Sequence, residues 1–287
     1  MTSSTISRPR PLSASAPRAA VLVESVSKRF RVRCLGRMAL KEALVGGMLG
    51  RRPPVVTHWA LRDVSFSLRT GRSLGIIGHN GAGKSTLLRL LCGLGRPTRG
   101  RISCADRVSG LLELGSGFHP DLTGRENLIT GGILSGLTER EVRARQDEVI
   151  GFAELEESID LPVRTYSTGM YLRLAFATAM QLDPAVLVMD EVFAVGDARF
   201  QRKCLERVEA FRAAGKTLVL TSQAPEHVRA LCDEVIVLEE GRVVMQGDPD
   251  AALACYRELL ADRGARRPAT PEDAASRPDR PEVRWAT

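Results

Sequence analysis

The chain has 287 residues, 44% of them hydrophobic, which is enough for one large domain or two small domains with a buried core. Its formal net charge of +7 suits a polyanionic partner or an anionic membrane face, but no basic run is interleaved with aromatic residues, so no nucleic-acid partner is expected. Six scattered cysteines without a C-x-x-C pair indicate free thiols in a reducing compartment. No apolar run is long enough to span a bilayer. If the protein moves something across a membrane, another polypeptide must supply the channel.

The two ends of the chain differ in composition from its middle. Residues 1–20 are rich in Ser, Pro, Arg and Ala without a period, and residues 263–287 have the same character, so we expect a disordered N-terminal segment and a flexible C-terminal tail. Between them, residues 21–262 alternate strand-like and helix-like patterns, which predicts a parallel α/β core. A run of helices without strands, at about residues 115–180, indicates a helical insert.

The individual elements follow from hydrophobic periodicity and from the turn residues between them. We expect helices at residues 84–94, 125–137, 139–156 and 171–180. We expect strands at residues 21–30, 60–70, 73–78, 107–114, 185–190, 217–222 and 234–247, the last being two strands joined at Glu240–Gly241.

The stretch GHNGAGKST at residues 78–86 fits the phosphate-binding pattern G-x-x-x-x-G-K-[ST]. It follows a short apolar strand and opens a helix, which is the context that such a loop requires. Backbone N–H groups and the helix N-terminus are expected to hold the phosphates of a nucleoside triphosphate, while Lys84 neutralises them and the Ser85 hydroxyl binds Mg²⁺. The predicted loop residues are Gly78, His79, Asn80, Gly81, Ala82, Gly83, Lys84, Ser85 and Thr86.

A second acidic element follows the apolar strand at residues 185–190. Asp190 ends this strand and is positioned for the Mg²⁺ shell, whereas Glu191 is free to polarise a water aimed at the γ-phosphate. An acidic pair at a strand end is common and usually only solvated. The phosphate loop elsewhere in the chain favours the catalytic interpretation.

The stretch YSTGMYLRLAFATAM opens a helix at Ser167, Thr168, Gly169 and Met170. Taken alone, this is an ordinary helix cap, in which Ser caps the helix and Gly lets another backbone approach. Together with the phosphate loop, it resembles the signature motif of ATP-binding cassette proteins, and the resemblance covers roughly residues 21–260. It implies the α/β fold of that family, with a parallel-sheet core, an antiparallel β subdomain and a helical insert.

The resemblance also implies ligands and partners. ATP would be the nucleotide, and two copies of the chain would form a homodimer in which the signature of one copy closes on the γ-phosphate held by the other. The stretch AVGD resembles the dimer contact called the D-loop and would place Asp197 there. Phe30 resembles the aromatic residue that stacks on adenine, and Trp59 is the rival for this position.

Longer stretches, LLELGSGFHPDLTGRENL and DEVFAVGDARFQRKC, look like the branch of the family that exports lipid-linked polysaccharides such as O-antigens, capsules and teichoic acids. This implies a transport ATPase on the cytoplasmic face of the cell membrane, bound to a transmembrane permease. The glycan would be cargo, and no direct sugar-binding module is expected because only a short polar tail ends the chain. Residues 37–52 suit either an amphipathic helix near the membrane or an ordinary surface helix.

Two positions depart from the family pattern. Glu113 and Leu114 stand where these proteins usually place the Gln of the Q-loop, so Glu113 is the candidate substitute. Gln223 stands where the family usually has a His that holds the γ-phosphate and the attacking water. Gln can donate a hydrogen bond but carries no charge, so we expect slow hydrolysis rather than none.

Three functions remain to be compared at this point. The leading one is an ATP-hydrolysing motor subunit of a polysaccharide exporter. The second is a non-catalytic subunit in which ATP only holds a dimer closed, because Gln223 replaces the His. The third is a soluble chromosome- or ribosome-associated cassette, against which the length of a single cassette and the lack of a coiled-coil arm both argue.

Overall fold

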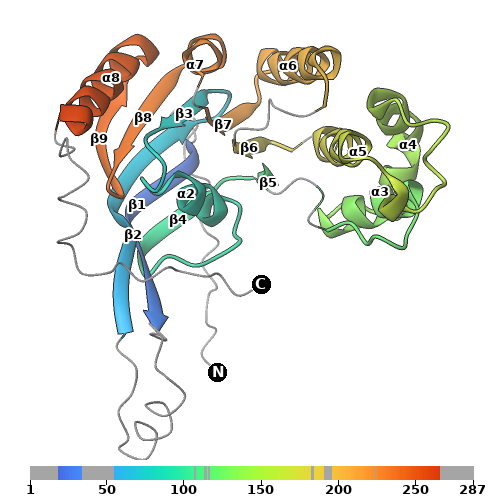
Figure 1. Cartoon of the computed structure of the whole chain (residues 1–287), viewed down its shortest axis with the longest axis horizontal. Helices are drawn as coiled ribbons and strands as arrows, with labels where there is room; N and C mark the ends of the chain where they lie inside the picture. The colour runs from blue at the N-terminus through green and yellow to red at the C-terminus, as the bar shows by residue number, and fades with distance from the viewer. Residues whose placement is uncertain are drawn as a thin grey trace, which may run out of the picture.

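The computed structural model describes residues 19–33, 55–106, 108–112, 115, 117–181, 184–190, 196–222 and 224–265. The predicted terminal segments and the candidate helix at residues 37–52 therefore lie wholly or almost wholly outside the described residues. The described chain contains two sheets and two groups of helices, and Figure 1 shows their arrangement.

The first sheet is antiparallel and has three strands in the order β2-β1-β4. Its members are β1 (Ala19–Arg33), β2 (Val55–Arg69) and β4 (Arg99–Cys104). Strands β1 and β2 pair along their whole length, with several register shifts between Ala19 and Arg29. The far ends of these two strands extend as a ribbon beyond the rest of the sheet (Figure 1).

The second sheet has six strands in the order β5-β6-β7-β3-β8-β9, of which only β9 runs antiparallel. Residues of β3 and β7 are all buried, as expected for apolar runs at the centre of a parallel sheet. The strands are β3 (Ser73–Ile77), β5 (Val108–Leu111), β6 (Val186–Asp190), β7 (Thr217–Thr221), β8 (Glu234–Glu239) and β9 (Arg242–Gly247). This sheet confirms the predicted parallel α/β core.

The helices cover the second sheet and also build a separate lobe. They are α2 (Lys84–Leu91), α3 (Gly124–Leu134), α4 (Glu139–Ala153), α5 (Thr168–Gln181), α6 (Ala198–Ala213), α7 (Pro225–Leu231) and α8 (Pro249–Ala265). A short 3₁₀ turn, Val163–Thr165, precedes α5. None of the described helices is both long enough and apolar enough to cross a bilayer.

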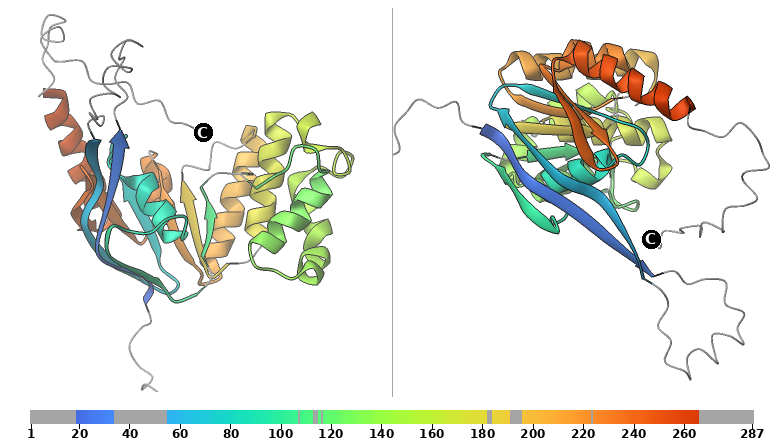
Figure 2. Two further views of the ribbon diagram at one scale, coloured as in Figure 1. Left: turned by 90° about the horizontal axis from the view of Figure 1, so that it is seen from below. Right: turned by 90° about the vertical axis from the view of Figure 1, so that its left-hand side faces the viewer.

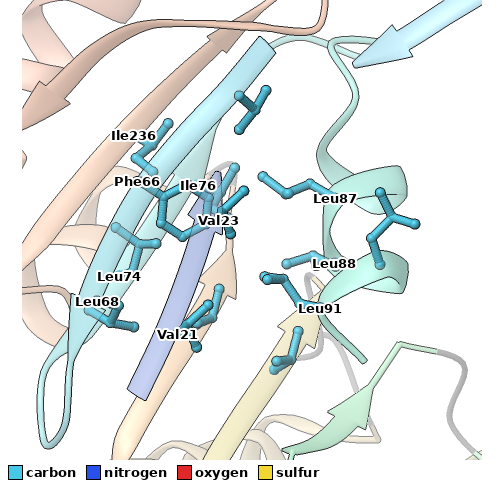
Figure 3. Close-up of a cluster of buried hydrophobic side chains, with 14 of the residues drawn as sticks. Val21, Val23, Phe66, Leu68, Leu74, Ile76, Leu87, Leu88, Leu91 and Ile236 are labelled. Carbon is cyan, nitrogen blue, oxygen red and sulfur yellow. The ribbon is translucent and has the colours of Figure 1, made fainter. Parts of the chain in front are cut away.

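Two clusters of buried apolar side chains lie on the two faces of the parallel sheet. One fills the space between the antiparallel sheet, α2 and the parallel sheet, and Figure 3 shows part of it, including Phe66, Ile76, Leu87 and Ile236. The other lies under α5 to α8 and is centred on rings such as Phe176 and Phe200. In the left view of Figure 2, strands β1 and β2 (blue) and helices α3 and α4 (green) lie on opposite sides of the molecule.

A third apolar cluster belongs to α3, α4 and α5, which form the lobe that extends away from the first sheet (Figure 1). Leu128, Val149 and Leu174 are among its buried members. Both α3 and α4 begin with a complete capping box, Thr123 with Glu126 and Thr138 with Glu141. The helices expected from the sequence at residues 125–137, 139–156 and 171–180 are thus present, and α5 begins earlier, at the predicted signature.

Four described elements were not predicted from the sequence: β4, α6, α7 and α8. Strand β4 has mostly exposed residues and carries Arg and Gly, so it lacks an apolar alternation. Helix α6, by contrast, buries Phe200, Cys204, Val208 and Phe211, a helical spacing that is visible in the sequence.

One carboxylate fastens the beginning of the central strand β3. The backbone N–H and the hydroxyl of Ser73 both donate to Asp233 Oδ2 at 2.8 Å, and guanidinium nitrogens of Arg72 and Arg212 lie 3.4 and 3.7 Å from Oδ1. Burial alone would raise the pKa of Asp233, but the Ser73 hydrogen bonds and the two cations outweigh it and lower the pKa below its ordinary value.

We therefore expect Asp233→Asn to lower the free energy of unfolding by about 1–3 kcal/mol at pH 7. Because the folded-state pKa is lowered, the carboxylate stabilises the protein above its unfolded pKa, and this contribution is lost as the pH falls through the folded pKa. The difference in free energy of unfolding between variant and parent, measured with urea, should become smaller as the pH falls from about 5 to about 3. A gap that stays constant over this range would contradict the assignment.

Candidate functional site

An open cavity of about 480 Å³ lies where the antiparallel sheet meets the loop after β3. Its size is within the range of small-molecule sites in proteins. Residues from β1, β2, the loop, the start of α2 and the end of β6 line it: Phe30, His58, Ala60, Asn80, Gly81, Gly83, Lys84, Ser85, Thr86 and Asp190. Most of the predicted loop residues therefore surround a single cavity, together with one predicted metal ligand.

The loop follows a path that side chains would obstruct. Gly83 has φ of +110°, and a Cβ at this position would lie 2.5 Å from the carbonyl oxygen of Ala60 on β2. Gly81 has φ of +86°, but nothing lies within 4 Å of the place its Cβ would take. Gly83 thus lets β2 approach the loop, while the space around Gly81 is open on the cavity side.

Lys84 brings a buried positive charge to this loop. Its ammonium donates to the backbone carbonyls of Gly78, at 2.7 Å, and His79, at 3.2 Å, so the side chain folds back along the loop. Helix α2 begins at Lys84 with no side chain capping its first N–H groups and no acidic residue in its first turn. The charge, the N–H groups without a side-chain cap and the positive end of the helix dipole all favour an anion here, which fits the phosphates of a nucleotide.

Asp190, at the end of β6, supplies a carboxylate on the cavity wall. Its Oδ1 accepts a hydrogen bond of 2.5 Å from the hydroxyl of Thr221, the residue that pairs with it at the end of β7. Ser85 lines the same cavity. Hydroxyl and carboxylate oxygens are suitable ligands for Mg²⁺, which usually takes few protein ligands beside substrate phosphates, so these residues fit the predicted metal.

The two aromatic candidates for the nucleobase separate clearly in the structure. Phe30 lines the cavity, whereas Trp59 is not among its lining residues, and its ring lies 5.5 and 5.8 Å from the guanidinium groups of Arg29 and Arg99. Strand alternation explains this, since Phe30 pairs with His58 and Arg29 pairs with Trp59 on the other side of the ribbon. The geometry favours Phe30 over its rival.

The predicted signature residues lie away from the cavity of the same chain. Ser167 accepts a hydrogen bond from the Met170 N–H at 3.2 Å at the start of α5, in the lobe of α3 to α5 (Figure 1). Ser167 and Thr168 are exposed. A Cβ on Gly169 would meet only Ser167 Oγ, at 3.8 Å, so packing within this chain does not require glycine there.

Asp197, the predicted D-loop residue, caps α6. It accepts from the Phe200 N–H at 2.9 Å and from Arg173 of α5 at 2.5 Å. The hydrogen bond from Phe200, supported by the charge of Arg173, lowers the pKa of Asp197 and keeps it ionised. Arg173 also bonds Glu154 at the end of α4, so one guanidinium joins the helical lobe to α6.

Three predicted residues fall outside the described part of the chain. These are Glu191, Gln223 and the candidate Q-loop substitute Glu113. Three further residues at the site were missed from sequence: His58 and Ala60 in the cavity wall and Thr221 behind Asp190. Thr221 ends the neighbouring parallel strand, and strand ends that meet at one sheet edge are a signal for it.

A glycine-rich loop between a buried parallel strand and an uncapped helix defines the class of P-loop nucleoside-triphosphate-binding proteins. Within that class, residues 61–194 match the family described as ABC transporter. The chain is 43% identical over 245 residues to the ABC transporter protein AbcA of Aeromonas salmonicida, covering 85% of this chain and 78% of the relative. It therefore belongs to the ABC transporter family of ATP-binding cassette proteins.

A second relative indicates a branch of this family. The O-antigen export system ATP-binding protein RfbB of Myxococcus xanthus is 44% identical over 248 residues. The match covers 84% of this chain but 56% of that protein, so the chain spans about half the length of this relative. Among solved structures, a dimeric ATP-binding cassette in a post-hydrolysis state with ADP and phosphate superposes with a TM-score of 0.63 at 22% identity, covering 80% of this chain and 98% of that one.

The two loop glycines give a matched stability test. Both Gly81→Ala and Gly83→Ala introduce the strain of positive φ, about 1–2 kcal/mol each. Only Gly83→Ala also drives a Cβ against the Ala60 carbonyl, adding about 1–3 kcal/mol. In urea unfolding, Gly83→Ala should therefore have a clearly lower free energy of unfolding than Gly81→Ala. Equal losses of this free energy in the two variants would show that the close approach of β2 is absent.

Proposed function

We propose that the chain is the ATP-binding and ATP-hydrolysing subunit of an ABC transporter that exports a lipid-linked polysaccharide across the cytoplasmic membrane. One observation carries the ATPase part: Lys84, Ser85 and Asp190 meet at a single cavity at the uncapped start of α2. The family membership and the export names of its relatives support the transport part. In this view, residues 21–262 form the cassette, and residues 115–180 form its helical insert.

Each residue of the site has a defined task in this proposal. N–H groups of the loop between Asn80 and Lys84 bind phosphate oxygens, apart from the Ala82 N–H, which donates to the His79 carbonyl, and the Lys84 ammonium offsets the phosphate charge. Ser85 and Asp190 would hold Mg²⁺, which would neutralise charge on the phosphates, and the Thr221 hydroxyl fixes the orientation of Asp190. Glu191 accepts the proton of the attacking water, and Gln223 hydrogen-bonds the γ-phosphate.

The second half of the site comes from a second copy of the chain. Ser167 to Met170 are exposed or half-buried at a helix start, in a lobe separate from the cavity. Room for a side chain at Gly169 within this chain supports the approach of another molecule as the reason for glycine. A homodimer would then place the signature of one copy on the phosphates of the other, with Asp197 at the contact between the copies.

The membrane-spanning path belongs to a permease partner, so the cassette is peripheral and lies on the cytoplasmic face, where ATP is available. The glycan is cargo of the complex and is not held by the cassette itself. Movement of the helical lobe on closure and reopening of the dimer would transmit the work of hydrolysis to the permease.

Dimer trapping tests this proposal. Glu191→Gln removes the proton acceptor but leaves the phosphate contacts, so the variant should run as a dimer with Mg-ATP and as a monomer without it, measured by light scattering after gel filtration. Adding Lys84→Ala to this variant should abolish the dimer, because the phosphates lose their cation. Persistence of a monomer at saturating Mg-ATP would contradict the proposed pairing of copies.

The slow turnover expected from Gln223 has its own test. Gln223→His restores a group that can carry a charge beside the transition state, so phosphate release by the assembled complex should rise about 10- to 100-fold. Unchanged turnover would show that Gln223 does not limit hydrolysis. Gln223→Ala provides the control, and it should be slower than the parent because no hydrogen bond remains.

A further inference from the structure

We propose that His58 binds the nucleobase: its imidazole and the Phe30 ring form one surface of two side chains, called here the two-ring platform, on which the adenine of ATP lies. The inference rests on the proposed function, because it takes ATP as the ligand of the cavity. It adds a contact from β2 to the one that the resemblance gives to Phe30 on β1.

The strand pairing brings the two rings to the same side. Phe30 of β1 and His58 of β2 are directly opposite in the antiparallel ladder, and both line the cavity. Directly opposed residues have Cβ atoms about 5 Å apart and share a face of the sheet. The rings are therefore neighbours, and together they extend the wall across both strands of the ribbon.

The backbone fixes how far the platform lies from the phosphate loop. The Ala60 carbonyl packs against Gly83, and the Arg62 N–H donates to Gly241 at 2.8 Å, so β2 is fastened to the loop just beyond His58. His58 lies two positions before Ala60 on the extended strand, which is a distance of about 7 Å. A base joined through ribose to phosphates on the loop therefore lies at the height of the two rings.

Phe30 alone offers limited area to a purine. The Lys28 ammonium lies 5.4 Å from the centre of the Phe30 ring, on one of its faces, and is held there by a 2.7 Å hydrogen bond to the Arg96 carbonyl. A purine has two fused rings, and the single ring of Phe30 can cover only part of their surface. The exposed His58 ring supplies the remaining contact, since nucleobases stack on His side chains as well as on Phe.

The test compares a ligand with a base to one without. Binding of Mg-ATP and of magnesium tripolyphosphate to the full chain is measured by titration calorimetry for the parent, His58→Ala, His58→Phe and Thr57→Ala. His58→Ala should weaken ATP about fivefold and leave tripolyphosphate unchanged, because only the base loses a contact. His58→Phe should keep ATP affinity within about twofold, since a ring remains. Thr57, exposed and one residue along β2, is the matched control and should change neither affinity.

Each other outcome has one meaning. Parental ATP affinity in His58→Ala, or an equal loss of ATP and tripolyphosphate affinity, would overturn the platform. If the parent binds neither ligand, or if Lys84→Ala weakens neither, the proposed ATP site itself is wrong, whatever His58 does. Equal melting temperatures of parent and variants check that the exposed substitutions leave the fold intact.

Discussion

A backbone junction between β2, the phosphate loop and the turn after β8 sets the geometry of the whole site. The Ala60 carbonyl fits against Gly83 and Gly241, the Arg62 N–H donates to the Gly241 carbonyl, and the Gly241 N–H donates to the Ala82 carbonyl at 3.0 Å. No side chain takes part in these contacts, so they depend on glycine at both positions. Through this junction the antiparallel sheet becomes one wall of a cavity whose floor belongs to the parallel sheet.

In the proposed dimer, the two halves of each nucleotide site would come from different parts of two copies of the chain. The phosphate loop and Asp190 belong to the sheet core, whereas Ser167 belongs to a lobe with an apolar core of its own. Helix α5 belongs to both parts, because Leu174 is buried in the cluster of the lobe while Phe176 and Met180 are buried in the cluster under the sheet, so any movement of the lobe passes through this helix. A second copy bound to the first would complete the site only in one relative position of the lobes, which is what a nucleotide-driven motor requires.

Sequence patterns predicted the parts of the site that depend on local order. The phosphate loop and Asp190 at its strand end needed only the short pattern around them. The choice between Phe30 and Trp59 was not decidable, because the register shifts at Val26, Lys28 and Arg29 change which residues of the ribbon share a face. His58 and Thr221 depend on which strands become neighbours, and β1 with β2 and β6 with β7 are separated by many residues in the chain. The apolar spacing of α6 was visible, however, and could have been used.

The ion pairs of Arg173 connect α5 to the start of α6 and to the end of α4. This side chain leaves α5 about 9 Å along the axis from Ser167 and holds both Glu154 and Asp197. Lys203 joins Glu154 from α6, and its hydrogen bond, with the nearby guanidiniums, lowers the pKa of that carboxyl. In the proposed dimer, a displacement of the start of α5 would therefore reach the first turn of α6 through the Arg173 guanidinium, which holds Asp197. Contact of the neighbouring copy with the signature at Ser167 would then affect Asp197 without any rearrangement of the sheet.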